Sequence, residues 1–72
     1  MTQKMQRAFG KRVRDLRKSR GWTQEQMAHT TGLHWSYIGQ AERGERNLTL
    51  LTLSVIAKAF KMKVSELLRG ID

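Results

Sequence analysis

The sequence predicts an all-α fold, a compact domain of five helices in which the second and third form a helix-turn-helix. Apolar residues recur at spacings of three and four, and no stretch alternates apolar and polar residues for long enough to predict a strand. Glycines at positions 21, 32, 44 and 70 fall where helices are expected to end. With 72 residues, the chain is expected to form one domain with a single core.

The first helix is expected over about residues 3–20, ending at Gly21. Its apolar residues recur at spacings of four, four and three and therefore share one face. They are Met5, Phe9, Val13 and Leu16. Most of the other positions of this helix are polar, with many Lys and Arg.

The second helix is expected to begin at Thr23, because the sequence TQEQ at residues 23–26 fits a capping box. In this motif the Thr oxygen accepts from the amide of residue 26, and the Gln26 side chain returns to the amide of residue 23. The inner face is expected to contain Met27, Ala28 and Thr31. Gly32 ends the helix, in a left-handed conformation that glycine adopts freely.

Three more helices are expected over residues 35–43, from the N-cap Thr49 to about residue 60, and from Ser65 to about residue 70. Only Gly32, Leu33 and His34 separate the second helix from the third. A short turn with glycine between two short helices is typical of a helix-turn-helix.

The third helix has two unlike sides when its residues are placed roughly 100° apart. One side holds Tyr37, Ile38, Ala41 and Glu42, of which Ile38 and Ala41 are expected to anchor the helix to the core. The other side holds Ser36, Gly39, Gln40 and Arg43, with Trp35 at the border. That side suits the major groove of DNA, which is about 12 Å wide and admits one helix.

Each residue of the polar side has a role it could take there. Gln40 can pair with adenine, Arg43 with guanine or a phosphate, and Ser36 with either kind of group. Trp35 is interpreted as a base or sugar contact or as a partly packed surface aromatic, and Tyr37 as a core residue whose hydroxyl reaches a phosphate.

The charge balance also favours a nucleic-acid partner. Lys and Arg number 14 against 6 Asp and Glu, for a net charge of +8. The pI of about 11.0 lies above the threshold of about 9 that is typical of nucleic-acid-binding domains. A basic amphipathic helix on an anionic membrane surface is a weaker alternative. No apolar run approaches the ~20 residues of a membrane span. No signal peptide or cysteine is present, so a cytoplasmic protein without metal or cofactor is expected.

The segment TQEQMAHTTGLHWSYIGQAERG, residues 23–44, resembles the helix-turn-helix of the phage-lambda-repressor-like regulators, the Xre family. That family opens its second helix with Thr-Gln-Glu, turns at Ala-x-x-x-Gly-Leu and ends its third helix with Ile-x-x-x-Glu-Arg-Gly. All three elements occur here, and RKSRGWTQ and RNLTLLTLSVIAKAF extend the match over nearly the whole chain. ERGERNLTLLTL is similar to the controller proteins of restriction–modification systems, although small phage and plasmid repressors share it.

The resemblance implies a lambda-repressor-like DNA-binding and dimerisation domain over residues 1–72. It implies a homodimer on an inverted-repeat operator in double-stranded DNA, controlling its own promoter and a restriction–modification operon. The residues implied to contact DNA are Gln24, Trp35, Ser36, Tyr37, Gln40, Arg43, Arg46, Asn47 and Thr49. Trp35, Ser36 and Gln40 would read bases, Arg46 would read a base or hold a phosphate, and the others would lie near the backbone.

Further residues have roles implied by the same resemblance. Arg17 and Glu42 are expected to form a structural, partly buried ion pair. Glu25 and His29 lie where some relatives touch RNA polymerase. His34, a poorer cap than the usual Ser, Asp or Thr, and Trp35, in place of a polar residue, depart from the family pattern. These departures affect the expected operator sequence and leave the docking mode unchanged.

The fourth helix is too apolar for a single buried face. Leu53, Ile56, Ala57 and Phe60 form one stripe, and Leu51, Val55, Ala59 and Met62 form a second. A partner chain would bury the second stripe, unless the helix has one wide core face. The residues predicted for the dimer interface are Leu51, Val55, Met62, Leu67, Leu68 and Ile71, with the last three expected to be divided between interface and core.

Other classes of protein fit the sequence less well. The few carboxylates are scattered, and neither a nucleophile–base pair nor a glycine-rich phosphate loop is visible, so an enzyme is not expected. RNA binding is not favoured because no aromatic sheet platform is predicted. No ligand domain, and hence no small-molecule effector, is expected. The main alternative is an antitoxin whose partner is a toxin protein.

Overall fold

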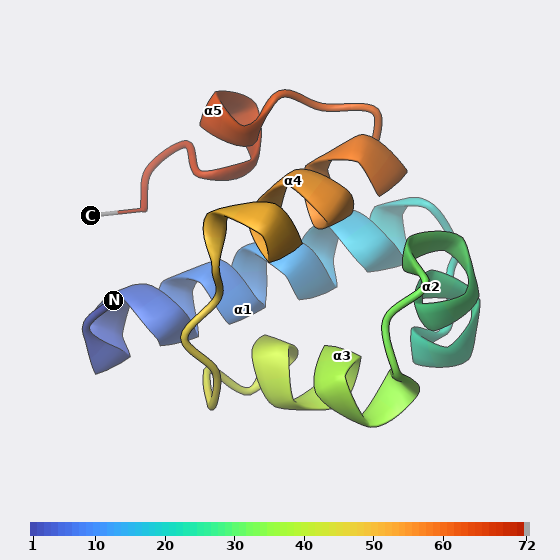
Figure 1. Ribbon diagram of the computed structural model, residues 1–72, viewed down its shortest axis with the longest axis horizontal. Coiled ribbons are helices and arrows are strands. Elements are labelled where there is room, and N and C mark those ends of the chain that lie inside the picture. The colour runs from blue at the N-terminus through green and yellow to red at the C-terminus, as the bar shows by residue number, and fades with distance from the viewer. Residues whose placement is uncertain (72) are drawn as a thin grey trace.

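The computed structural model describes residues 1–71, and these form five α-helices and no strand. The helices are α1 (Gln3–Ser19), α2 (Gln24–Thr31), α3 (Trp35–Glu42), α4 (Leu50–Ala59) and α5 (Val64–Leu67) (Figure 1). The predicted all-α, five-helix fold is confirmed, and the first four helices lie where they were expected. No helix in this part of the chain is long and apolar enough to cross a membrane.

The short fifth helix differs from its prediction. It was expected to follow Ser65, but it begins at Val64 and ends at Leu67. The reason is a cap that lies earlier in the chain, because the Glu66 carboxylate accepts a hydrogen bond from the Lys63 amide at 3.1 Å. A side chain returning from the first turn satisfies an amide that would otherwise have no helical partner.

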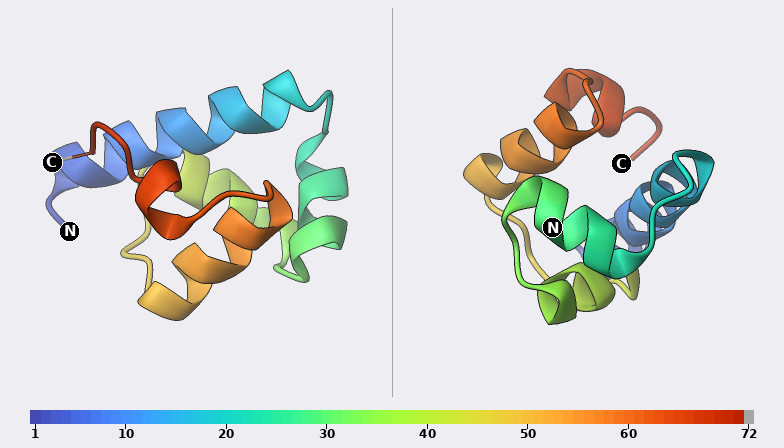
Figure 2. Two further views of the ribbon diagram at one scale, coloured as in Figure 1. Left: turned by 90° about the horizontal axis from the view of Figure 1, so that it is seen from above. Right: turned by 90° about the vertical axis from the view of Figure 1, so that its right-hand side faces the viewer.

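The long helix α1 spans the molecule, with α3 and α4 on two sides of it (Figure 1). Figure 2 shows that α2 closes one end of the molecule, where it contacts both α3 and α4, and that α5 packs against α4. The core lies between these elements. Its buried members are Phe9, Val13, Met27, Ile38, Leu53, Ile56, Ala57, Phe60 and Leu67.

Helices α1 and α3 approach each other closely at Gly10, a buried residue in the middle of α1. A Cβ atom at Gly10 would lie 2.4 Å from the carbonyl oxygen of Glu42 and 2.6 Å from that of Ala41. Backbone atoms cannot give way as a flexible side chain can, so only glycine permits this approach. The end of α3 is thereby held against α1.

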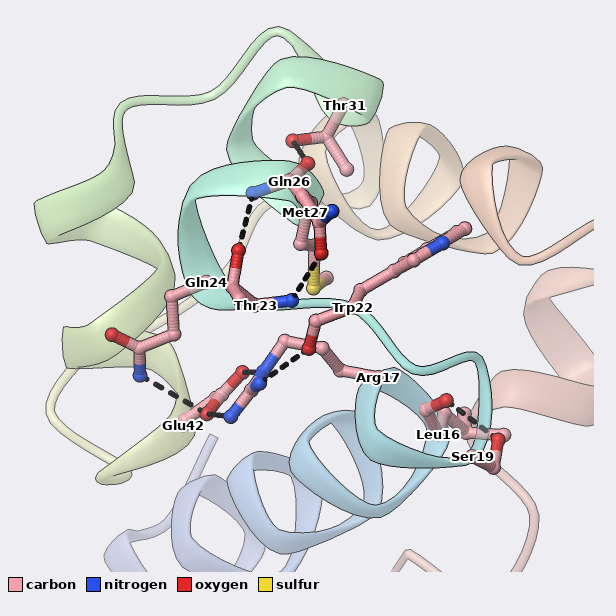
Figure 3. A network of polar contacts seen from close by, with 10 residues as sticks. All are labelled: Leu16, Arg17, Ser19, Trp22, Thr23, Gln24, Gln26, Met27, Thr31 and Glu42. Atoms are coloured by element: carbon pink, nitrogen blue, oxygen red, sulfur yellow. Dashed lines mark hydrogen bonds and ion pairs between the residues drawn. The ribbon is translucent and has the colours of Figure 1, made fainter.

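A buried ion pair fixes the orientation of α3 (Figure 3). Arg17 of α1 donates from Nε to Glu42 Oε2 at 2.6 Å and from Nη2 to Oε1 at 3.0 Å. Arg17 Nη1 also donates to the Trp22 carbonyl at 2.7 Å, and Gln24 Nε2 of α2 donates to Glu42 Oε1 at 3.2 Å. The two charged side chains are only 10% and 4% exposed. Three helices therefore meet at one carboxylate.

Replacing Glu42 with Ala should lower the free energy of unfolding by about 3–5 kcal/mol, because Arg17 would remain buried without its counter-charge. The double variant Arg17→Met, Glu42→Leu should recover part of that loss, since no unpaired charge is left. Chemical denaturation followed by circular dichroism measures both changes.

The matched control is Glu45→Ala, which removes the acid of an exposed ion pair, that between Arg43 and Glu45. Exposed pairs contribute little, so stability should hardly change. A loss for Glu42→Ala as small as that of the control would show that the Arg17–Glu42 pair does not hold the fold.

Candidate nucleic-acid interface

The helix-turn-helix is built by local hydrogen bonds that its sequence encodes. Thr23 Oγ1 accepts from the Gln26 amide at 3.1 Å, and Gln26 Oε1 accepts from the Thr23 amide at 2.7 Å, so the predicted capping box is present (Figure 3). Gly32 ends α2 with a φ of 75°, and its amide donates to the Ala28 carbonyl at 2.8 Å. The left-handed residue turns the chain so that α3 can start at Trp35.

His34 caps α3 through its imidazole ring. Its Nδ1 accepts from the Ser36 amide at 3.2 Å and lies 2.7 Å from Ser36 Oγ. The imidazole nitrogen thus takes the place of the hydroxyl or carboxylate oxygen of a common cap. The ring also stacks on Trp35, with centroids 5.9 Å apart, which orients an indole that is 58% exposed.

Helix α3 shows the predicted division between a buried and an open side, with one exception. Ile38 and Ala41 are buried at 1% and 2% exposure. The residues left accessible on the other side are Trp35, Ser36 and Arg43, which are exposed, and Gln40, which is half-buried.

Gly39 is a correction, because helical spacing placed it on the open side of α3 and it does not lie open. It is buried in the structure, and a Cβ atom there would lie 3.2 Å from Arg43 Nη1 and 3.5 Å from Gln24 Oε1. The long side chains of Gln24 and Arg43 lie over this position and cover it. Gly39 therefore makes room for two neighbouring side chains of the same surface.

Gln24 lies at the N-terminus of α2, as a phosphate-binding residue should, but its amide is directed inward. It is half-buried, and its Nε2 donates to Glu42. Gln24, Thr23 and Trp35 line one shallow hollow beside the N-terminus of α2. The positive end of a helix dipole attracts anions, but the Glu25 carboxylate lines the same hollow and repels them.

The loop after α3 begins with a Schellman motif. The Gly44 amide donates to the Ala41 carbonyl at 3.1 Å, and the Glu45 amide donates to the Gln40 carbonyl at 2.9 Å. Gly44 has a φ of 77°, and a Cβ atom on it would lie 2.8 Å from Arg7 Cγ. The loop is therefore folded back against the end of α3 and against α1.

Two arginines of this surface already have partners. Arg43 Nε donates to Glu45 Oε2 at 2.9 Å, and this hydrogen bond lowers the pKa of the Glu45 carboxyl and raises that of Arg43. Arg46 Nε donates to Gln40 Oε1 at 2.8 Å, and its guanidinium lies 5.1 Å from the ring centroid of Tyr37. The structure thus brings Tyr37, Gln40 and Arg46 together.

The last two residues expected to contact DNA are held at the ends of this loop. Asn47 Oδ1 accepts from Gln6 Nε2 at 2.8 Å, so the loop is tied to α1. Thr49 Oγ1 caps α4 by accepting from the Thr52 amide at 3.1 Å. The Gln6 contact was not predicted, because residues 41 positions apart give no local signal.

The residues expected in a dimer interface separate into three kinds. Leu51 is 74% exposed, and its neighbour Leu50, which was not predicted, is 78% exposed. Leu67 is a correction, because it is fully buried in the chain's own core and has no surface to offer a partner. Met62, Leu68 and Ile71 are partly buried against that core, and Val55 is half-buried on α4.

A separate exposed surface lies on α2. Glu25 and His29, which the resemblance places toward RNA polymerase, line a shallow depression together with Trp22, Thr23, Gln26 and Thr30. Within residues 1–71 no three His, Cys, Asp or Glu side chains gather as metal ligands.

Known proteins resemble this chain over most of its length. The helix-turn-helix family model HTH_3 matches residues 13–67. Control protein C.SmaI from Serratia marcescens is 50% identical over 56 residues, which cover 78% of this chain and 67% of that protein. Control protein C.BamHI from Bacillus amyloliquefaciens is 38% identical over 69 residues, covering 94% and 85% of the two chains.

Solved structures agree with these relatives. The crystal structure of the restriction-modification controller protein C.AhdI from Aeromonas hydrophila matches with a TM-score of 0.78 and 42% identity, covering 82% of this chain and 89% of that one. The wild-type controller protein C.Esp1396I matches with a TM-score of 0.81 and 27% identity, covering 93% and 87%. The chain therefore belongs to the helix-turn-helix family HTH_3, among the Xre-type transcriptional regulators.

Proposed function

We propose that this protein is a sequence-specific regulator that places α3 in the major groove of double-stranded DNA in the cytoplasm. The observation that carries the proposal is the accessible side of α3, which holds Trp35, Ser36, Gln40 and Arg43. These side chains offer donors, acceptors and one aromatic ring, while Ile38 and Ala41 hold the opposite side in the core. A net charge of +8 supplies the attraction to phosphates.

The contacts would divide between bases and backbone. Trp35, Ser36 and Gln40 project from the first turns of α3 and are the proposed base readers. Tyr37 and Arg43 lie beside them on α3 and would contact the DNA backbone. Gln24, before α3, and Asn47 and Thr49, after it, would also contact the DNA backbone. Arg46, on the loop after α3, would read a base or hold a phosphate. On binding DNA, Arg43 would release Glu45 and bind a phosphate. This exchange would cost little, because the Arg43–Glu45 pair is exposed and solvated.

The proposed functional unit is a homodimer. Leu50 and Leu51 are exposed side by side at the start of α4, with the half-buried Val55 one turn further along. Adjacent exposed leucines are unfavourable in water and typical of an interaction surface. A two-fold dimer would present two copies of α3 to half-sites about one helical turn apart, that is, to an inverted repeat.

The names of the relatives suggest what is regulated. Control protein C.SmaI, control protein C.BamHI and the restriction-modification controller C.AhdI share at least 38% of aligned residues with this chain. On this basis we propose control of the protein's own promoter and of a restriction–modification operon. If activation is part of that control, Glu25 and His29 on the accessible side of α2 are where RNA polymerase would bind.

Purified protein, with no other component, should select an inverted-repeat duplex from a randomised library. If the dimer neutralises about six to ten phosphates, its affinity for that duplex should fall by about 10³–10⁵ between ~50 and ~200 mM salt. Fluorescence anisotropy at several salt concentrations measures this slope, and a scrambled duplex of equal length and composition is the control.

Failure to enrich any duplex would refute the proposal and favour the antitoxin alternative, in which a protein partner is the main target. Equal affinity for the selected and scrambled duplexes would refute sequence-specific binding.

Leu51→Asp should convert the dimer into monomers. The free energy needed to bury an unpaired carboxylate exceeds the free energy gained from the remaining apolar contacts of the interface. Analytical ultracentrifugation measures the change. Leu51 is 74% exposed in the single chain, so its replacement should leave the helical circular dichroism spectrum unaltered. Gln3→Asp adds the same charge at an exposed position of α1 and should remain dimeric. A Leu51→Asp variant that dimerises like the wild type would move the interface elsewhere.

A further inference from the structure

We infer that Arg14 of α1 and Arg43 together bind one phosphate of the DNA backbone, in a hollow that lies between α1 and α3. Arg14 is not among the residues proposed above to contact DNA. The inference deepens the proposed function and rests on it, because it assumes that α3 enters the major groove.

The hollow is a small depression of about 140 Å³ where three helices meet. Its lining comes from α1, from the start of α2 and from the end of α3, and consists of Arg14, Arg17, Gln24, Gly39, Glu42 and Arg43. Gly39 leaves room for it, because Arg43 Nη1 lies 3.2 Å from the point that a Cβ atom of residue 39 would occupy. The guanidinium of Arg43 is therefore held beside the hollow.

Two of the three arginines that line the hollow are already bound to a carboxylate. Arg17 donates twice to Glu42, so the charge of that buried acid is compensated within the fold. Arg43 donates to Glu45 from Nε and Nη2, which leaves Nη1 as its remaining group of donors on the side of Gly39. The two carboxylates thus cancel the charges of these two arginines.

Arg14 carries the charge that no acid compensates. It is exposed, and within residues 1–71 its side chain makes no hydrogen bond or ion pair. The neighbouring acid, Asp15, is bound to Lys11 with an Nζ to Oδ2 distance of 2.9 Å. The hollow therefore has a net positive charge, unlike the hollow that Glu25 lines beside α2. A guanidinium offers several donors in one plane, which suits the oxygens of a phosphate.

The hollow continues into a basic face of α1. This face contains Lys4, Arg7, Lys11, Arg14 and Lys18. At roughly 100° per residue, these five positions lie within about 80° of one another. Arg7 lies against Gly44 in the loop after α3, and Arg14 lines the hollow beside Gly39. The basic face therefore borders α3 at two places, one turn of chain beyond each end of the Gly10 contact.

A helix in the major groove has DNA backbone close beside it. The groove is about 12 Å wide, and an α-helix with its side chains measures about 10–12 Å across. The backbone must then pass the elements that flank α3, which are α1 and α2. Gly10 brings α1 against the end of α3, and Arg14 follows it by one turn. A phosphate that passes this end of α3 would meet Arg14 and Arg43 from two different helices.

Arg14→Gln removes the charge and keeps a long polar side chain. Each phosphate contact contributes about 0.9 to the slope of log K against log salt, so the slope should become shallower by about 0.9 per subunit, or about 1.8 for a dimer. Arg14→Lys keeps the charge and should keep most of the slope. Fluorescence anisotropy with the selected duplex at several salt concentrations measures these slopes. Arg14 is exposed, so circular dichroism should show an unaltered fold.

The matched control is Lys61→Gln, which lowers the net charge by the same amount. Lys61 is exposed in the segment between α4 and α5, and this segment lies on the side of the molecule opposite α3 (Figures 1 and 2). An effect of net charge alone would appear in both variants. A direct contact should change the slope of Arg14→Gln and leave that of Lys61→Gln close to the wild-type value.

A second measurement locates the phosphate. Duplexes are prepared in which one phosphate at a time is replaced by an uncharged methylphosphonate. At one position in each half-site, this replacement should weaken wild-type binding about tenfold, as expected for the loss of one charge-assisted contact. The same replacement should weaken Arg14→Gln and Arg43→Gln much less, because the two arginines share that phosphate. Lys61→Gln should retain the full effect.

An unchanged slope in Arg14→Gln, or an equal loss of slope in Lys61→Gln, would overturn the inference, since Arg14 would then act through net charge alone. An Arg14→Gln variant that remains sensitive to every methylphosphonate would overturn it as well. Sensitivity lost at different positions in the Arg14 and Arg43 variants would show that they bind separate phosphates, against the inference. The proposed function survives each of these outcomes and fails by a different one, the absence of any selected duplex.

Discussion

The buried pair of Arg17 and Glu42 is the interaction on which the orientation of α3 depends. It joins α1 to the last residue of α3, and Gln24 adds α2 to the same carboxylate. Burying two charges is costly, and an apolar pair of equal volume can be as stable. An apolar pair, however, has no preferred direction. The bidentate geometry of Arg17 and Glu42 fixes how far α3 turns about its own axis, and hence which side chains it exposes.

Glycines at two positions allow the rest of the surface to form around that pair. Gly10 lets the backbone of α1 approach the carbonyl groups that end α3, and Gly44 lets the following loop pass Arg7. The left-handed turn at Gly44 then places Arg46 over Gln40 and Tyr37. The position of Arg46, which would face DNA, thus depends on Gly44, and Gly44 in turn contacts Arg7 of α1.

Local chemistry made most of the fold predictable. The Thr23–Gln26 capping box and the Thr49 cap are encoded within four residues, and both are present. The wrong burial assignments came from side-chain contacts that helical spacing does not describe. Helical spacing assigns Gly39 to an open side, but it does not report the reach of the side chains that cover it. The adjacent positions of Leu67 and Leu68 do not reveal which of the two turns inward, and in the structure Leu67 is the buried one.

The accessible surface is organised before any DNA binds. Asn47 is bound to Gln6, Arg43 to Glu45 and Arg46 to Gln40, so few of its polar groups are free to rotate. Fixing these side chains in advance lowers the entropy lost on association. Under the proposed function, a base edge would meet donors and acceptors whose directions these bonds already set. Under the proposed function, selectivity would therefore depend in part on hydrogen bonds within the protein itself.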